Sequence, residues 1–167
     1  MAEQLRGRGF SEDASEGAPL CRWLVDGITV DIMPTDEATL GFSNRWYREA
    51  FEHATLTVIE CVAIRVVTAP FFLATKLEAF KARGRNDYMA SHDLEDVVAL
   101  VDGRSELIEE VSMSPNAMQS YLAAAFRELL ANPMFLDALS GHLPGDVASQ
   151  QRLPLLLERL RRISASA

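Results

Sequence analysis

The stretch PFFLATKLEAFKARGRNDYMASHDLED, residues 70–96, predicts two helices joined by a short loop. The first helix is expected over residues 69–82, because apolar side chains recur there at helical spacing and form one stripe. That stripe consists of Leu73, Leu77 and Phe80. Lys76 and Arg83 are seven residues apart, so they lie one above the other along its edge. A cation at such an edge can bury its stem and direct its charge into a cleft.

The second helix carries two carboxylates near its start. Asp93 lies in line with apolar residues and therefore points toward the core, while Asp96 follows about one turn later on the flank. Two cations and two carboxylates are thus expected to converge at one wall. A structural explanation stays open, since Ser91 or Asp93 can cap the second helix. In that case Lys76 and Arg83 are surface cations with partly buried stems.

Length, charge and cysteine content limit the classes of protein. A chain of 167 residues, 49% of them hydrophobic, fits one domain or one domain with a helical extension. Its net charge of −8 argues against binding nucleic acid through overall charge, although Arg83 and Arg85 are candidates for a local basic rim. Cys21 and Cys61 lie in strand-like runs, so we expect buried free thiols and a reducing cytoplasm. We expect no signal peptide and no membrane segment.

Two β-hairpins are predicted in the first half of the chain from β-branched residues and turn signals. Their strands are expected over residues 21–25, 28–33, 55–59 and 62–67. Asp26-Gly27 at the first turn is a strong hairpin signal. Asp31 stands among apolar residues near a strand end, where it either faces water or is displayed into a site. A helix is expected over residues 45–53, after a helix-start signal at residues 35–37.

The chain beyond Gly103 is expected to be helical. Helices are predicted over residues 105–113, 115–130 and 135–139, with a final one around residues 153–160. Pro154 lies inside the last pattern, so a new helix start or a kink is expected there. The fold class is therefore α+β, with a sheet region over residues 1–68 and a helical region over residues 69–167 that completes the wall of a site.

Three motifs together resemble a known family. They are VDIMP at residues 30–34, PxxLATKLEAFxxR at residues 70–83 and DxxD at residues 93–96. These residues look like the nucleotidyltransferase toxins of type IV toxin–antitoxin systems, the AbiEii-like proteins of the polymerase-β-like fold. The resemblance covers residues 21–103 and implies an incomplete mixed sheet with helices. It also implies transfer of NMP from an NTP to an RNA or protein acceptor, with Mg²⁺ as cofactor and an antitoxin as partner.

The resemblance implies a role for each of five residues. Asp31 matches a carboxylate that binds metal and activates the acceptor hydroxyl, and Asp93 matches an essential helical aspartate, so both are catalytic candidates. Lys76 matches the lysine that neutralises the triphosphate, and Arg83 the arginine near it. Asp96 matches the partner of the helical aspartate and completes the candidate nucleotide-binding set.

The chain departs from the family pattern at two places. His92 stands where the family often has an arginine, and no Gly-rich turn with an Asp-x-Asp strand precedes Asp31. Asp13 lies in a predicted loop and Asp26 in a predicted turn, so neither replaces the absent carboxylates. The chain is therefore expected to begin in mid-domain, to catalyse weakly or not at all, and to leave a sheet edge open for an oligomer.

Two other interpretations stay open. The chain can be a non-catalytic interaction protein that keeps the scaffold and binds a partner such as an antitoxin. It can also be a plain helical binding module whose charges all lie on the surface. If Lys76→Ala abolishes triphosphate binding, the chain is either the enzyme or the interaction protein that keeps its scaffold. The helical binding module predicts no change in triphosphate binding.

Overall fold

The computed structural model describes residues 1–33, 44–84 and 86–166. The chain divides into two compact units, Met1–Ser43 and Asn44–Ala167, whereas the expected division fell after residue 68. Helices and small antiparallel sheets make the fold α+β, and its C-terminal part is helical, as predicted. The helix-start signal at residues 35–37 and the candidate rim residue Arg85 lie outside the described residues.

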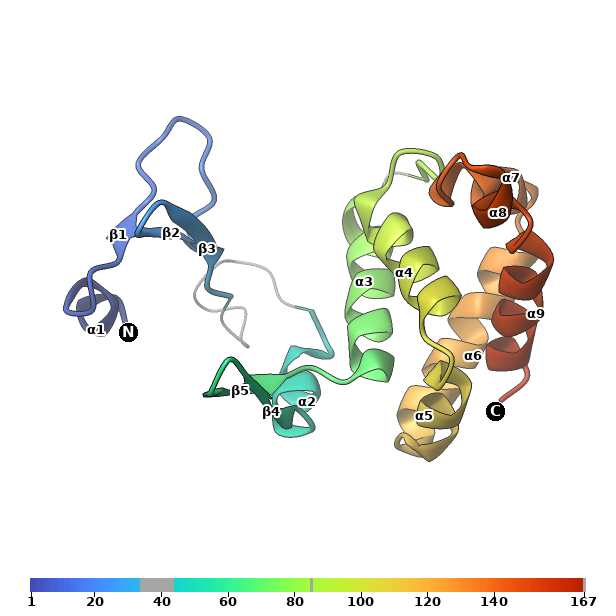
Figure 1. The fold of residues 1–167 in the computed structure, drawn as a ribbon, viewed down its shortest axis with the longest axis horizontal. Helices are drawn as coiled ribbons and strands as arrows, with labels where there is room; N and C mark the ends of the chain where they lie inside the picture. Colours follow the sequence, from blue (N-terminus) through green and yellow to red (C-terminus); the bar gives the residue numbers. More distant parts are fainter. Residues whose placement is uncertain (34–43, 85, 167) are drawn as a thin grey trace. The chain divides into compact units, whose positions relative to one another are not determined.

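The N-terminal unit contains a short helix and a three-stranded antiparallel sheet (Figure 1). These elements are α1 (Ala2–Arg6), β1 (Ser11–Glu12), β2 (Arg22–Val25) and β3 (Ile28–Asp31), with strand order β1-β2-β3. The predicted hairpin is confirmed, because β2 and β3 pair across a two-residue turn. Asp26 and Gly27 in that turn have φ values of 49° and 78°. Positive φ at both central residues gives the twist that a tight hairpin needs.

A second hairpin belongs to the C-terminal unit and forms a separate two-stranded antiparallel sheet, β4 (Thr55–Ile59) with β5 (Val62–Val66). The turn of this hairpin consists of Glu60 and Cys61, both with positive φ. The resemblance implied an incomplete mixed sheet, whereas the described strands pair only antiparallel, in two sheets. Both cysteines are free thiols, but only Cys21 is buried. The expectation of a buried thiol was wrong for Cys61, because it occupies a hairpin turn rather than a strand.

Helices make up the rest of the C-terminal unit (Figure 1). They are α2 (Tyr47–Glu52), α3 (Ala69–Arg83), α4 (His92–Gly103), α5 (Leu107–Met113), α6 (Asn116–Leu130), α7 (Pro133–Ala138), the 3-10 turn η1 (Leu139–His142), α8 (Val147–Gln150) and α9 (Leu153–Ser164). Pro154 lies in the first turn of α9 and so marks a new start, not a kink. Within the described part of the chain, no helix is long and apolar enough to cross a membrane.

The hydrophobic core lies between α3, α4, α6 and α9. Helix α3 packs against α4 and α6, and α6 packs against α9. The predicted stripe on α3 is buried, and it meets large side chains that are also fully enclosed. These include Leu94, Leu122, Phe126, Phe135, Leu156 and Leu160. Burying a side chain of this size contributes about 1.5–3 kcal/mol, so this packing fixes the position of α3 and α4.

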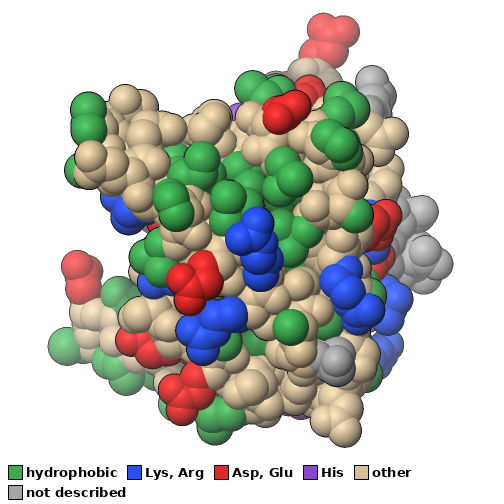
Figure 2. Space-filling model, turned by 90° about the vertical axis from the view of Figure 1, so that its right-hand side faces the viewer, with side chains coloured by type: hydrophobic (Ala, Val, Ile, Leu, Met, Phe, Trp, Pro, Cys, Tyr) green, Lys and Arg blue, Asp and Glu red, His purple; other side chains and the backbone are tan. Residues whose placement is uncertain are grey.

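Charged and hydrophobic side chains are both exposed on the face shown in Figure 2, which is the side where α9 lies in Figure 1. Hydrophobic side chains gather in the upper half of this view. Large hydrophobic side chains exposed on the C-terminal helices α7, α8 and α9 are Met134, Leu136, Val147 and Leu155. Single exposed apolar residues of this kind are common on protein surfaces.

Two arginines bind the C-terminal end of α4. Arg152 donates from Nε and Nη2 to the carboxylate of Asp102, at 3.0 and 2.8 Å from Oδ2. Arg159 in α9 donates from Nη1 to the backbone carbonyls of Val101 and Asp102. The last carbonyls of a helix lack partners within the helix, and cations suit the negative end of its dipole. Helix α9 therefore holds the end of α4 in place.

We predict that Arg159→Met lowers the free energy of unfolding by about 1–3 kcal/mol, because two backbone carbonyls lose a charged donor. Methionine keeps the apolar stem, so packing is largely retained. Denaturant titration followed by circular dichroism measures the change. Arg161→Met is the matched control, since Arg161 is an exposed residue of α9, and we expect an effect within about 0.5 kcal/mol. Equal stability of the two variants would contradict the role assigned to Arg159.

Candidate functional site

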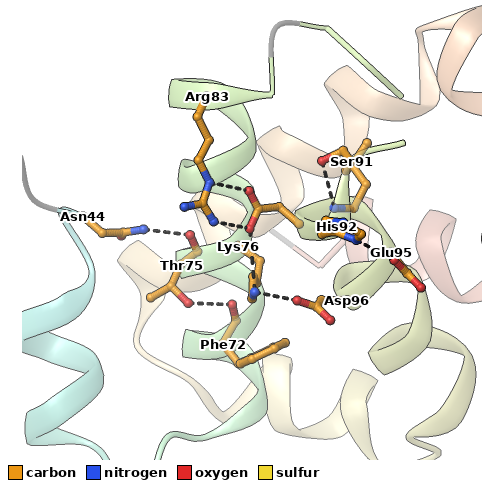
Figure 3. Close-up of polar contacts among 11 residues, drawn as sticks. Asn44, Phe72, Thr75, Lys76, Arg83, Ser91, His92, Glu95 and Asp96 are labelled. Carbon is orange, nitrogen blue, oxygen red and sulfur yellow. Dashed lines mark hydrogen bonds and ion pairs between the residues drawn. The ribbon is translucent and has the colours of Figure 1, made fainter. Parts of the chain in front are cut away.

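Helix α4 begins so that Asp93 faces the protein interior. Ser91 is the N-cap, and its hydroxyl accepts a hydrogen bond from the backbone N–H of Leu94 at 3.4 Å (Figure 3). Of the two capping candidates in the sequence, Ser91 therefore takes this role. The Asp93 carboxylate is left to bind side chains of α3, and it is 7% exposed.

Arg83 binds Asp93 through two parallel hydrogen bonds. Its Nε donates to Oδ2 at 2.9 Å and its Nη2 donates to Oδ1 at 2.8 Å (Figure 3). This forked geometry matches a planar guanidinium to a planar carboxylate and is among the strongest charged contacts in proteins. The carboxylate is buried, whereas the Arg83 side chain is 70% exposed. Arg83 therefore joins a buried anion to the surface.

Lys76 completes the cluster from the same helix. Its Nζ lies 3.7 Å from Oδ1 of Asp93 and 2.5 Å from Oδ2 of Asp96. It also lies 5.6 Å from the centroid of the Phe72 ring, within the range of a cation–π contact. Figure 3 shows Lys76 and Arg83 projecting from α3 toward α4. The predicted convergence of two cations and two carboxylates is confirmed.

The charges in this cluster stabilise one another. Burial raises the pKa of Asp93, but hydrogen bonds and charge from Arg83, with a smaller contribution from Lys76, outweigh it and leave this pKa below its ordinary value. The hydrogen bond to Asp93 raises the pKa of Arg83, against the effect of burial. Asp93 therefore stays ionised at neutral pH, although it is enclosed.

Asn44 fixes the backbone next to Lys76, and the sequence had not identified it. Its Nδ2 donates to the carbonyl of Thr75 at 2.7 Å (Figure 3). Its Oδ1 accepts from the N–H of Trp46 at 3.1 Å. An asparagine side chain that bonds the backbone two residues later is a common turn motif. The two-residue spacing between Asn44 and Trp46 is a signal from which the sequence could have predicted this turn. It does not indicate the hydrogen bond from Asn44 to Thr75 in α3.

A pocket of about 440 Å³ opens beside the Arg83–Asp93 contact. Its lining consists of Arg83, Gly84, Asp87, Ala90, Ser91, His92 and Asp93. His92, which replaces the arginine of the family pattern, is exposed and contacts Oε2 of Glu95 at 3.1 Å. The pocket thus presents one guanidinium next to one imidazole, in a volume that suits a small ligand.

Asp31 lies in the N-terminal unit, where it pairs with Arg22 on the neighbouring strand. Nε of Arg22 is 2.9 Å from Oδ1, and Nη2 is 3.2 Å from Oδ2. This hydrogen bonding lowers the pKa of Asp31. The structure thus brings together four of the five predicted site residues within one unit, on α3 and α4, and places Asp31 in the other unit.

The resemblance implies Mg²⁺ as cofactor, with Asp31 as the matched metal ligand. Mg²⁺ needs several oxygen ligands in octahedral geometry. Among residues 1–33, 44–84 and 86–166, no group of three or more histidine, cysteine, aspartate or glutamate side chains is placed to hold a metal ion. Both oxygens of Asp31, the predicted metal ligand, accept hydrogen bonds from Arg22.

Asp93→Asn should destabilise the protein by about 1–3 kcal/mol, because an amide nitrogen then faces the Arg83 donors in a buried position. The pKa of Asp93 is lowered in the folded state, so its ionised form stabilises the protein at pH values above the ordinary aspartate pKa. This stabilisation is lost as the pH falls through the lowered pKa of the folded state. Unfolding measured between neutral pH and about pH 3 should therefore show a shallower acid loss in the variant than in the wild type.

Glu95→Gln is the matched control, because Glu95 lies in the same first turn of α4 but is exposed. We expect it to change the free energy of unfolding by less than about 0.5 kcal/mol at neutral pH. If Asp93→Asn were as stable as this control, the buried pairing would not support the fold.

Comparison with known proteins gave no match for this chain, whether to a family model, a curated protein sequence or a solved structure. The resemblance to nucleotidyltransferase toxins therefore stays a prediction that rests on the sequence motifs, and the geometry of α3 and α4 is what the structure adds.

Proposed function

We propose that the chain is a nucleotidyltransferase-like protein in which Lys76 and Arg83 bind the phosphates of an NTP. The observation that carries this proposal is the pairing of both cations with one buried carboxylate, Asp93, which lines an open pocket together with Arg83. Such an arrangement holds positive charge at fixed points before a ligand arrives. Preorganised donors of this kind bind phosphate without further ordering of the side chains.

Arg83 keeps donors for a ligand. A guanidinium carries five N–H groups, of which two bind Asp93. The side chain is largely exposed, so the remaining N–H groups are accessible from the pocket. Arginine bound to a carboxylate on one edge and to a phosphate on another is well suited to position a triphosphate.

The second partner of Lys76, Asp96, is partly exposed to water. Asp96 is 44% exposed, so water screens its contact with Lys76 more than it screens the buried Asp93. A phosphate carries more negative charge than one carboxylate. It can therefore bind the ammonium group of Lys76 together with Asp96 or in its place. We propose that Asp93 holds the cations in place, while Asp96 marks the position that a phosphate takes.

The proposed reaction transfers NMP to a hydroxyl group of an RNA or protein acceptor. The acceptor oxygen forms a bond to the α-phosphorus, the bond from that phosphorus to the bridging oxygen breaks, and pyrophosphate leaves. Asp31 is the single residue matched to the metal-binding carboxylates, and it is paired with Arg22. We therefore propose that this chain alone catalyses weakly or not at all, and that it acts in the cytoplasm.

Calorimetric titration with each NTP tests the binding proposal. We expect Lys76→Ala and Arg83→Ala each to weaken binding about tenfold or more, because a charge-assisted contact is lost. Arg83→Lys should restore the charge but only part of the affinity, since lysine lacks the fork. Arg161→Ala, an exposed change in α9, is the control and should bind as the wild type does. Unchanged binding by Lys76→Ala would refute the proposal.

The same preparations test catalysis separately. Incorporation of labelled nucleotide into RNA or protein with Mg²⁺ should stay at background for the wild type. Robust turnover would show that the proposed weak catalysis is wrong. Phosphate binding by Lys76 and Arg83 would still be decided by the calorimetric titrations.

The hairpin β4–β5 favours a second candidate function, that of an interaction protein. Its two strands pair with each other and with no further strand among the described residues. Several of its apolar side chains are exposed, including Leu56 at 72%, Val58 at 67% and Val62 at 60%. Open edges invite pairing with another chain, and an isolated two-stranded hairpin is marginal alone. We propose that a strand of a second copy, or of a partner such as an antitoxin, pairs there.

We predict concentration-dependent self-association of the wild type in sedimentation experiments, and its loss in Val58→Lys, because an edge lysine opposes strand pairing. Val147→Lys, an equally exposed change in α8, is the control and should associate normally. A wild type that stays monomeric at all concentrations would exclude the second copy as occupant of the hairpin.

A further inference from the structure

A second pocket, of about 380 Å³, lies in the C-terminal helical unit. Its walls come from α3, from Asn86 and Tyr88, and from α6 with Asn132 after it. The lining consists of Leu77, Phe80, Lys81, Ala82, Asn86, Tyr88, Ala125, Glu128, Leu129 and Asn132. None of these residues lines the pocket beside Asp93, so the two pockets are separate.

One wall of this pocket is apolar and aromatic. Leu77 and Phe80 are buried members of the α3 stripe, and Leu129 is buried on α6. The rings of Phe80 and Tyr88 lie 5.3 Å apart between centroids, at an interplanar angle of 55°. Surfaces of this kind take flat, apolar ring faces, because aromatic contacts add to the burial of area.

The lining also offers polar groups with unused hydrogen-bonding capacity. Tyr88 Oη accepts from Asn132 Nδ2 at 2.9 Å, so its own proton remains available to a ligand. The amide of Asn86 has both a donor and an acceptor, and it makes no side-chain hydrogen bond within the described part of the chain. The Tyr88 hydroxyl and the Asn86 amide can therefore form hydrogen bonds with the edge of a planar ring that carries both donors and acceptors.

The charged side chains among the described lining residues pair with each other. Lys81 Nζ lies 3.4 Å from Glu128 Oε2, and the two side chains are 45% and 73% exposed. One cation and one anion in contact give no net attraction to a phosphate. This pocket favours an uncharged ligand whose edge makes hydrogen bonds, which distinguishes it from the cationic site on α3 and α4.

We propose that this pocket binds an uncharged nucleoside, with the face of the base against Phe80 and its edge on Asn86 and the Tyr88 hydroxyl. The volume lies in the range of small-molecule sites, and asparagine amides pair well with base edges. The proposal is independent of phosphate binding by Lys76 and Arg83. In a nucleotidyltransferase-like protein, such a site would hold the terminal base of an acceptor.

The backbone at Asn86 supplies a sharp test. Asn86 has a φ of 59°, in the left-handed region that asparagine and glycine tolerate best. Asn86→Gly therefore keeps the backbone conformation while it removes the amide. Ala82 is an exposed residue of α3 at the mouth of the pocket, so Ala82→Phe fills that mouth with little effect on the core.

The experiment is titration of the full chain with adenosine, guanosine, cytidine and uridine, followed by calorimetry and ligand-detected NMR. For a ligand of this size we expect a dissociation constant on the order of 0.1 mM for the best nucleoside. Asn86→Gly and Ala82→Phe should each weaken binding about tenfold or more. Ala117→Phe, an exposed change in the first turn of α6, should bind as the wild type does.

Lys76→Ala separates this inference from the phosphate site, because it should leave the affinity for nucleosides unchanged. Unchanged far-ultraviolet circular dichroism confirms that each variant is folded. Failure of all four nucleosides to bind at millimolar concentration, or equal binding by Ala82→Phe and Ala117→Phe, would overturn the proposal.

Discussion

The bidentate contact between Arg83 and Asp93 is the interaction on which the candidate site depends. An ionised carboxylate that is 7% exposed needs charged partners, because removal from water alone is strongly unfavourable. Those partners are available only when α3 and α4 pack with this register. The same carboxylate therefore orients two cations toward the surface and ties the last turn of α3 to the first turn of α4.

Helix α4 is held by arginines at both of its ends. Arg83 binds the carboxylate at its N-terminal end, while Arg152 and Arg159 bind the carboxylate and carbonyls at its C-terminal end. Between these ends the core fully encloses four apolar residues of α4, namely Leu94, Val97, Val98 and Val101. A helix fixed in this way keeps Asp93 and Asp96 at constant positions relative to α3, which is what a preorganised binding site requires.

The sequence predicted well those features that depend on local pattern. Helical spacing located α3 and placed Lys76, Arg83 and Asp93 at one wall, and Asp-Gly located the first hairpin. The two-residue turn sets the register of that hairpin and places Arg22 opposite Asp31. The sequence therefore contained enough information to predict this ion pair. The second hairpin was also predicted, although its turn at Glu60 and Cys61 contains no glycine or asparagine. The exposure of Cys61 and the contact of Asn44 with Thr75 were missed, because the first depends on the turn and the second joins residues far apart in the chain.

The exposed thiol at the tip of β4–β5 has a practical consequence. Cys61 stands at a hairpin turn, whereas the second cysteine, Cys21, is enclosed. A maleimide dye or nitroxide should therefore attach selectively at the tip in the native protein, without any substitution. A reporter at this position would sense the local environment of the hairpin directly, and its mobility would fall when another polypeptide strand lies alongside.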